Sequence, residues 1–331
     1  MEAVDERLEA ACRAVVDEFD PCLDMPQSGH CREAPVVITL RGLTKTYPGG
    51  RGIIDVSFQV AAGEVFGYLG PNGAGKSTTI RHLMGFLRPD GGTAKIRGLD
   101  CWSDAPKVQA SVGYLPGEIG FPDDMAGSEL LGLLAGMRLL PAGRDRREEL
   151  CARFDLDPQR PIRKMSKGTK QKVGLVAAFM HTPDVLILDE PTSGLDPLMQ
   201  RRFLELISEE KRRGATILMS SHAFAEVERV ADRVGILRDG RLVAVEDIAS
   251  LRQVQRKVFT VATDRDEDAR ALEGAGFPVV ARRDREIDLE VRGDYTAFVR
   301  ALARYEIRAL DVHPLDLEQI FMHYYAAKEA R

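Results

Sequence analysis

The sequence predicts an α/β protein built on an open sheet of parallel strands, and three short apolar runs support this fold class. Residues 65–69, 185–188 and 216–221 are rich in aliphatic and β-branched side chains, which is typical of buried strands. A glycine-rich loop follows the first run, two carboxylates follow the second, and a histidine follows the third. In such sheets ligands bind at the carboxyl ends of the strands, so we expect these three ends to hold the functional residues.

The glycine-rich loop after the first strand has a specific pattern. Residues 70–78 read GPNGAGKST, which fits Gly, four residues, Gly, Lys, then Ser or Thr. Such glycines let backbone amides face the phosphates of a nucleoside triphosphate, while the following helix, expected over 79–86, directs its positive end at them. A glycine-rich turn with an incidental lysine is the alternative, but the order of strand, loop and helix argues against it. The expected nucleotide contacts are Gly70, Asn72, Gly73, Ala74, Gly75, Lys76, Ser77 and Thr78.

Two carboxylates end the second strand, at Asp189 and Glu190. Asp189 is placed to hold Mg²⁺ directly or through water, together with the Ser77 hydroxyl. Glu190 is placed to orient and deprotonate the water that attacks the γ-phosphate, while Lys76 supplies a point charge to the phosphates. The alternative is a buried strand with a polar end and no catalytic role.

A further motif, MSKGTKQ at residues 165–171, lies between the loop and the acidic strand. With the motifs above, this motif makes the chain resemble the nucleotide-binding subunit of an ABC transporter, over about residues 36–245. Compared with the family signature L-S-G-G-Q, Ser166 and Gly168 are kept, whereas Lys167 and Thr169 differ. The resemblance implies a signature at a helix N-terminus that closes over the γ-phosphate held by an opposing subunit. Lys167 either adds positive charge there or is a solvated helix-cap residue.

Three other segments are similar to family elements. Residues 191–197 resemble the dimer-contact loop, which implies an interfacial role for Asp196. His222 corresponds to the family's switch residue at the γ-phosphate, and Tyr47 to the aromatic residue that stacks on the base. The alternatives are a Pro- and Gly-rich turn, a buried structural histidine and ordinary edge packing, respectively.

One departure from the family pattern affects the expected metal site. The segment 112–118 aligns with a loop that usually carries glutamine, and that position is Gly117 here. Glu118 next to it could take over as a Mg²⁺ ligand, since a carboxylate also coordinates this metal. We expect ATP turnover to survive, with a changed Mg²⁺ affinity and water orientation.

Six apolar residues between 130 and 140 recur at helical spacing: Leu130, Leu131, Leu133, Leu134, Met137 and Leu140. Such a stripe usually faces a core. The alternative is that part of it forms a groove for a short helix of a membrane partner, which ATP-driven closure would move.

The composition fits a soluble globular protein of two domains: 331 residues, 44% hydrophobic, 29% charged, net charge −5. No apolar run approaches the roughly 18 to 20 residues that cross a bilayer, and the acidic N-terminus lacks the features of a signal peptide. The chain is therefore expected in the cytoplasm, and without a basic stripe it is not expected to bind nucleic acid. We expect reduced thiols at the five cysteines, Cys12, Cys22, Cys31, Cys101 and Cys151. Three of them lie near His30, but their spacing matches no common zinc-binding pattern.

We divide the chain into an N-terminal helical extension and linker (1–35), an ABC nucleotide-binding domain (36–245) and a C-terminal α+β domain (246–331). The resemblance implies a RecA-like P-loop NTPase core with a helical subdomain at about 118–180. In the C-terminal domain the expected order is strand 258–262, helix 266–275, strand pair 278–291, helix 295–304 and strand 307–312, as in a ferredoxin-like split βαβ unit. A final helix would carry residues 317–321, which look like the terminal motif of export-type cassettes.

The sequence therefore predicts an MgATP-hydrolysing subunit that works as a dimer, with itself or with a paralogous ATPase subunit, at the inner face of the cell membrane. Export through separate permease subunits is what the altered signature and the C-terminal extension imply by resemblance. The alternatives are a soluble ABC-type ATPase and a low-turnover, nucleotide-gated regulatory subunit. The exported substrate is not encoded in this chain, because the permease would contact it.

Overall fold

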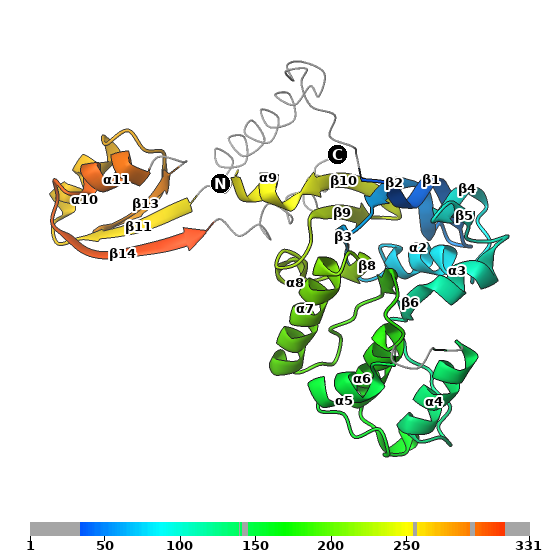
Figure 1. Ribbon diagram of the computed structural model, residues 1–331. Coiled ribbons are helices and arrows are strands. Elements are labelled where there is room, and N and C mark those ends of the chain that lie inside the picture. The colour runs from blue at the N-terminus through cyan, green and yellow to red at the C-terminus, as the bar shows by residue number, and fades with distance from the viewer. Residues whose placement is uncertain (1–33, 139, 141–144, 254–256, 292–294, 315–331) are drawn as a thin grey trace. The chain divides into compact units, whose positions relative to one another are not determined.

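The computed structural model describes residues 34–138, 140, 145–253, 257–291 and 295–314 (Figure 1). The chain divides into two compact units, Met1–Ala34 and Pro35–Arg331, and only the second contains described elements. The expected N-terminal helix, the group formed by Cys12, Cys22, His30 and Cys31, and the terminal motif at 317–321 lie outside the described residues.

A six-stranded sheet carries the three strands that the sequence predicted. β3, β7 and β8 are buried along their whole length, because helices or other strands cover both faces. β9, β3, β8, β7 and β6 are parallel, and β10 pairs antiparallel with β9 at one edge. In sheet order the strands are β10 (Arg241–Asp247), β9 (Arg233–Arg238), β3 (Val65–Leu69), β8 (Thr216–Ser221), β7 (Val185–Leu188) and β6 (Val112–Leu115).

A second, antiparallel sheet covers part of this core and was not predicted from the sequence. Its strands, in sheet order, are β2 (Gly52–Ala61), β1 (Val36–Thr46), β4 (Gly91–Ile96) and β5 (Leu99–Asp100). Phe58 of β2 stacks on Phe66 of β3, with ring centroids 4.9 Å apart, and also contacts Tyr68. This shared core fixes β3, and hence the loop that follows it, from the side of the antiparallel sheet.

The helix after the glycine-rich loop begins earlier than expected. It is α2, Lys76–Leu83, whereas the sequence predicted a helix over 79–86. Gly75 is its N-cap, with a φ of 110°, so the helix starts at the lysine itself. Gly85 has a φ of 68° and lies just beyond the helix, which explains why Phe86 is not helical.

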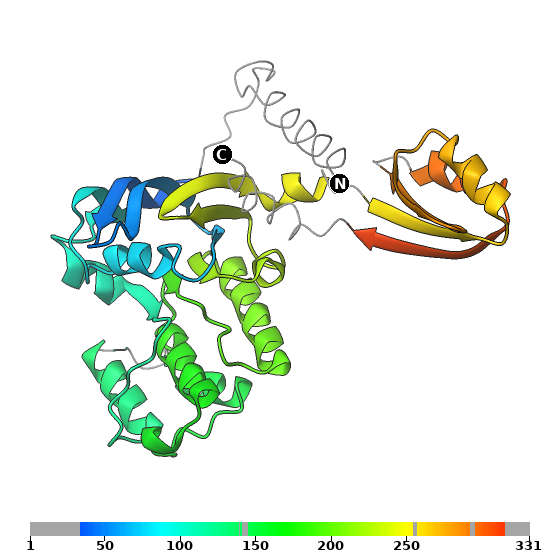
Figure 2. The ribbon, with the colours of Figure 1, turned by 180° about the vertical axis from the view of Figure 1, so that it is seen from behind.

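The remaining helices of this domain lie around the two sheets. Figures 1 and 2 both show α4, α5 and α6 grouped on one side of the six-stranded sheet. The helices are α3 (Ala105–Ser111), α4 (Gly127–Met137), α5 (Arg147–Arg153), a short 3₁₀ helix (Ile162–Lys164), α6 (Lys167–Phe179), α7 (Pro197–Arg212), α8 (Phe224–Val227) and α9 (Ile248–Gln253). No helix among the described residues is long and apolar enough to span a bilayer.

The apolar stripe of α4 divides between a buried and an exposed face. Leu130 and Leu131 are buried in the core with α6, as expected. Leu133 and Met137 are 52% and 74% exposed, so this part of the stripe does not belong to the core. An exposed apolar pair on a surface helix is suited to a partner contact.

The C-terminal domain has the predicted split βαβ order. Its four strands form one antiparallel sheet in the order β12-β13-β11-β14, and α10 packs against β11 and β13. The core includes Phe259, Val261, Ile287, Leu289 and Phe298. Its elements are β11 (Lys257–Thr263), α10 (Asp266–Glu273), β12 (Val279–Arg283), β13 (Glu286–Val291), α11 (Tyr295–Leu302) and β14 (Ile307–Pro314).

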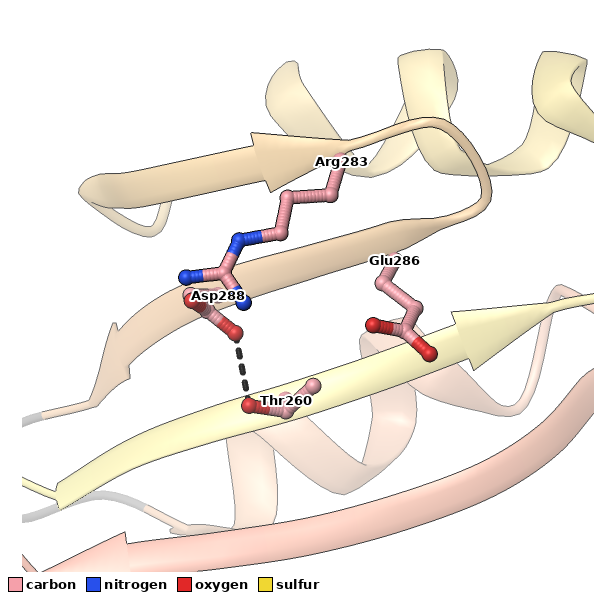
Figure 3. A pocket seen from close by; sticks show the side chains of 4 residues that line it. All are labelled: Thr260, Arg283, Glu286 and Asp288. Atoms are coloured by element: carbon pink, nitrogen blue, oxygen red, sulfur yellow. Dashed lines mark hydrogen bonds between the residues drawn. The ribbon is translucent and has the colours of Figure 1, made fainter.

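A polar pocket lies on this C-terminal sheet, lined by Thr260, Arg283, Glu286 and Asp288 (Figure 3). The Thr260 hydroxyl donates a hydrogen bond of 2.6 Å to Asp288 Oδ1. All four lining residues come from β11, β12 and β13, and none comes from the six-stranded sheet.

Candidate functional site

The loop between β3 and α2 has a backbone that requires its glycines. Gly73 and Gly75 have φ values of 83° and 110°, in the region that side chains other than glycine rarely adopt. A Cβ on Gly75 would also lie 2.6 Å from Ile53 Cγ2, and a Cβ on Gly70 would lie 2.6 Å from the carbonyl oxygen of Leu237. The loop is therefore held tightly between β2 and β9 and cannot accept larger residues at these positions.

The lysine of the loop is buried at its centre. Lys76 is 5% exposed, and its Nζ donates to the carbonyl oxygens of Gly70, at 2.6 Å, and Pro71, at 3.3 Å. Glu190 Oε1 lies 3.0 Å from the same Nζ. The ammonium group thus links the loop to the carboxylate that follows β7.

Three side chains from three neighbouring strand ends meet here. Glu190 follows β7, His222 follows β8, and Lys76 lies beyond β3. His222 Nδ1 lies 2.7 Å from Glu190 Oε2, while the other oxygen of this carboxylate faces Lys76. The sequence-predicted catalytic residues are therefore brought together, with Glu190 between a lysine and a histidine.

Asp189 is buried beside a residue that the sequence analysis missed. Asp189 is 3% exposed, and its Oδ1 accepts a hydrogen bond of 2.6 Å from Ser220 Oγ. The Ser220 hydroxyl also accepts a bond of 2.9 Å from the backbone N–H of Glu190. A serine near the end of a fully buried apolar strand was the available signal, since a buried hydroxyl needs partners.

Gln171 is a second residue that the sequence analysis missed. It lies on α6, is 2% exposed, and its Nε2 donates to the carbonyl oxygens of Glu190, at 3.3 Å, and Pro191, at 3.0 Å. The helix that begins with the signature motif is thus hydrogen-bonded to the backbone of the acidic pair.

The expected metal ligands lie in different surroundings. Gly117 is next to Asp189, because a Cβ on this glycine would lie 3.0 Å from Asp189 Oδ2. Glu118 is exposed and Ser77 is half-buried at the start of α2. Among the described residues, no three His, Cys, Asp or Glu side chains are grouped so that they could hold a metal ion by themselves. A metal at Asp189 would therefore need hydroxyl, phosphate or water oxygens as well.

The signature motif forms the start of α6. Ser166 is the N-cap, and its Oγ accepts a bond of 3.2 Å from the Thr169 N–H. Gly168 lies against the loop before α7, because a Cβ there would be 2.4 Å from the carbonyl oxygen of Gly194. Lys167 is exposed at the first position of the helix, next to the same glycine. This position fits both alternatives for Lys167, added positive charge near a phosphate and a solvated residue at the helix start.

Asp196 and Tyr47 occupy exposed positions. Asp196 is the N-cap of α7, and its Oδ1 accepts a bond of 3.0 Å from the Met199 N–H. Tyr47 follows β1 and is 37% exposed, so its ring is accessible to a ligand. Neither position is part of the group formed by Lys76, Glu190 and His222.

Two nearby titratable groups are held neutral. Burial, assisted by the charge of Asp189, raises the pKa of Tyr114 on β6 to about 12. Burial, with the positive charge of Lys45 as a smaller cause, lowers the pKa of His82 on α2 to about 4.

Comparison with protein families and curated relatives gives a consistent match. The family model described as "ABC transporter" matches residues 53–193. The chain is 33% identical over 302 residues to the daunorubicin/doxorubicin resistance ATP-binding protein DrrA of Streptomyces peucetius, covering 86% of this chain and 91% of that protein. It is also 33% identical over 225 residues to the bacitracin transport ATP-binding protein BcrA of Bacillus licheniformis, covering 67% of this chain and 73% of that protein.

Solved structures give the same fold. An ATP-binding subunit of an ABC transporter superimposes with a TM-score of 0.61 at 34% identity, covering 66% of this chain and 92% of that one. A dimeric ATP-binding cassette, MJ0796, bound to ADP and Pi, superimposes with a TM-score of 0.58 at 21% identity, covering 64% of this chain and 98% of that one. This second likeness shows the fold alone.

Proposed function

The chain belongs to the ABC transporter family of ATP-binding proteins, and on this premise we propose that it powers export of a substrate through a separate membrane permease. As a member of this family it is an ATPase. The observation that carries the ATP-hydrolysing part of this proposal is the meeting of Lys76, Glu190 and His222 at the ends of neighbouring strands. Two relatives, one named for daunorubicin/doxorubicin resistance and one for bacitracin transport, support a role in transport.

We infer the following roles in hydrolysis. The loop amides and Lys76 hold the β- and γ-phosphates, so Lys76 exchanges its bonds to the loop carbonyls and Glu190 for phosphate oxygens. Glu190 then accepts the proton of the water that attacks the γ-phosphorus, and the bond to the leaving ADP oxygen breaks. His222 orients the Glu190 carboxylate and contacts the γ-phosphate. Tyr47 stacks on the base.

The oxygens of Ser77 and Asp189 fit Mg²⁺, which prefers hard oxygen ligands and keeps several waters. Asp189 binds Ser220 through Oδ1, and its Oδ2 faces the side of Gly117, where no side chain intervenes. Bound Mg²⁺ would supply charge neutralisation of the phosphates. Glu118, exposed one residue further on, is proposed as an additional ligand through water.

The active unit is proposed to be a dimer, with a second copy or with a paralogous ATPase subunit. Ser166 and Gly168 of one subunit would then close over the γ-phosphate held by the other, and Asp196 would lie at the interface. The amides at the start of α6 and the exposed charge of Lys167 suit an anionic ligand. The exposed pair Leu133 and Met137 on α4 is proposed to receive a cytoplasmic helix of the permease.

Co-purification from membranes tests the transporter assignment. The tagged chain, captured from detergent-solubilised membranes of its host, is expected to bring down a multi-span membrane protein in stoichiometric amount. Replacing both Leu133 and Met137 by Ser should reduce that recovery while ATP hydrolysis by the purified chain persists. Ribosomal partners, or no stable partner, would contradict the proposal and favour a soluble ABC-type ATPase.

The proposed metal role of Glu118 gives a separate prediction. Glu118→Ala is expected to raise the Mg²⁺ concentration needed for half-maximal hydrolysis by about tenfold, because a carboxylate near the bound metal is lost. Asp124→Ala is the matched control, since this carboxylate is exposed in the same segment. An Mg²⁺ titration of the ATPase rate that is identical for Glu118→Ala and the unaltered chain would exclude Glu118 as a ligand.

A further inference from the structure

We propose that Gln171 and Ser220 are positioning residues for hydrolysis, which together hold the Glu190 peptide so that its carboxylate faces the reacting water. This inference rests on the function proposed above, in which Glu190 is the general base. Neither residue touches the nucleotide in this proposal, since both act through Glu190.

The backbone of Glu190 adopts a conformation that its own chemistry disfavours. Its φ is 48°, in the left-handed region that costs free energy for a residue with a Cβ. Such a residue stays in this conformation only when its surroundings fix it, and strained residues of this kind gather at functional sites. Contacts with neighbouring residues must therefore hold the Glu190 peptide in this conformation.

Two buried side chains make those contacts, one on each side of the Glu190 α-carbon. Ser220 Oγ accepts from the Glu190 N–H at 2.9 Å, and Gln171 Nε2 donates to the Glu190 carbonyl oxygen at 3.3 Å. Ser220 is fully buried and Gln171 is 2% exposed, so water cannot replace either contact without rearrangement. These two hydrogen bonds form a clamp on the Glu190 peptide. The Glu190 carboxylate beyond this clamp lies against the ammonium of Lys76 and the ring of His222.

Each half of the clamp also binds a second group that matters for the reaction. Ser220 donates to Asp189 at 2.6 Å, so one hydroxyl sets the proposed metal ligand and the base relative to each other. Gln171 also donates to Pro191, at 3.0 Å, where the dimer-contact loop begins. Gln171 lies on the helix capped by Ser166, so a shift of the signature end of α6 would be passed directly to the Glu190 peptide.

Substitution at each residue tests the clamp. Gln171→Leu and Ser220→Ala, each in the full chain, are expected to lower kcat for ATP hydrolysis by about 10- to 100-fold, which is the effect of a small misplacement of a reacting group. The Kd for ATP should change much less than kcat, because neither residue belongs to the phosphate loop. A fall in ATP affinity equal to the fall in kcat would contradict a positioning role.

Two control variants remove similar side chains elsewhere. Gln109→Leu removes an amide that donates to the Met84 carbonyl oxygen at 2.9 Å, and Ser208→Ala removes a half-buried hydroxyl on α7 that donates to the Leu204 carbonyl oxygen at 3.0 Å. Both controls should keep kcat. If they lose as much activity as Gln171→Leu and Ser220→Ala, the losses reflect general packing and the inference is wrong.

A double-mutant cycle separates this inference from the proposed function. In a Glu190→Gln background, Gln171→Leu should cause little further loss of kcat, because its effect passes through the carboxylate already removed. Independent, multiplying losses would overturn the inference while leaving Glu190 as the base. Full activity of Glu190→Gln alone would instead overturn the general-base assignment itself.

Discussion

Glu190→Gln is expected to lower kcat for ATP hydrolysis by about 100- to 10,000-fold, the range over which general-base catalysis contributes to enzymatic rates. The amide that replaces the carboxylate has nearly the same size and shape but cannot accept a proton from water. Its contact with His222 at the Oε2 position can persist, because an amide also forms hydrogen bonds. The substitution therefore removes the proton acceptor and keeps the hydrogen bond to His222.

ATP binding should survive this substitution or become tighter. In the structure Lys76 Nζ lies 3.0 Å from Glu190 Oε1, so the carboxylate competes with phosphate oxygens for the lysine. Removing that negative charge also reduces repulsion of the anionic nucleotide. We therefore expect a lower Kd for ATP together with the lower kcat, measured by fluorescence titration and by phosphate release.

Glu205→Gln is the matched control, since Glu205 is an exposed carboxylate on α7 paired with Arg201. This variant should hydrolyse ATP at the rate of the unaltered chain. Wild-type turnover by Glu190→Gln would show that another group takes the proton. Loss of ATP binding along with turnover would show that Glu190 shapes the nucleotide site and does not act as the base.

The parts of the site that the sequence predicted are encoded by neighbouring residues. The phosphate loop, the acidic pair and His222 each directly follow an apolar run, so local order identifies both the strand and the group at its end. The parallel arrangement then places these ends together, as β3, β8 and β7 do. The fold class and the split βαβ order of the C-terminal domain could also be predicted, because each element is identified by residues that are neighbours in the sequence.

The parts that the sequence analysis missed depend on contacts between distant segments. Ser220 and Gln171 look like an ordinary strand serine and a helix glutamine until β8 and α6 lie against the acidic pair. The antiparallel sheet was missed because its strands carry partly exposed residues and its buried face is completed by β3. The early start of α2 follows from the left-handed Gly75, which a helical pattern alone does not show.

Gly168 gives the second large effect, because the structure leaves no room for any side chain there. A Cβ on this residue would lie 2.4 Å from the carbonyl oxygen of Gly194, well inside the closest approach of two such atoms. The obstructing atom belongs to the backbone, so the clash cannot be relieved by rotating a side chain. Gly194 has a φ of 76°, which fixes its loop in a conformation that favours glycine. Gly168→Ala must therefore move the start of α6 away from the loop before α7.

We expect Gly168→Ala to lower ATP turnover by about 100-fold, because the signature and the dimer-contact loop would no longer share one surface. ATP binding by the phosphate loop of the same chain should persist, since Gly73, Gly75 and Lys76 do not contact Gly168. ATP-dependent dimerisation, followed by size-exclusion chromatography in a Glu190→Gln background that slows turnover, should be weakened. These two readouts separate a damaged interface from a damaged nucleotide site.

Gly136→Ala provides the control for adding a methyl group to a helix glycine. Gly136 lies within α4, and a Cβ there meets nothing within 4 Å, so alanine should be neutral or slightly stabilising at that position. If Gly168→Ala instead hydrolyses ATP like Gly136→Ala, the close packing against Gly194 is not needed for catalysis. The requirement for glycine in the altered signature would then have to come from the opposing nucleotide alone.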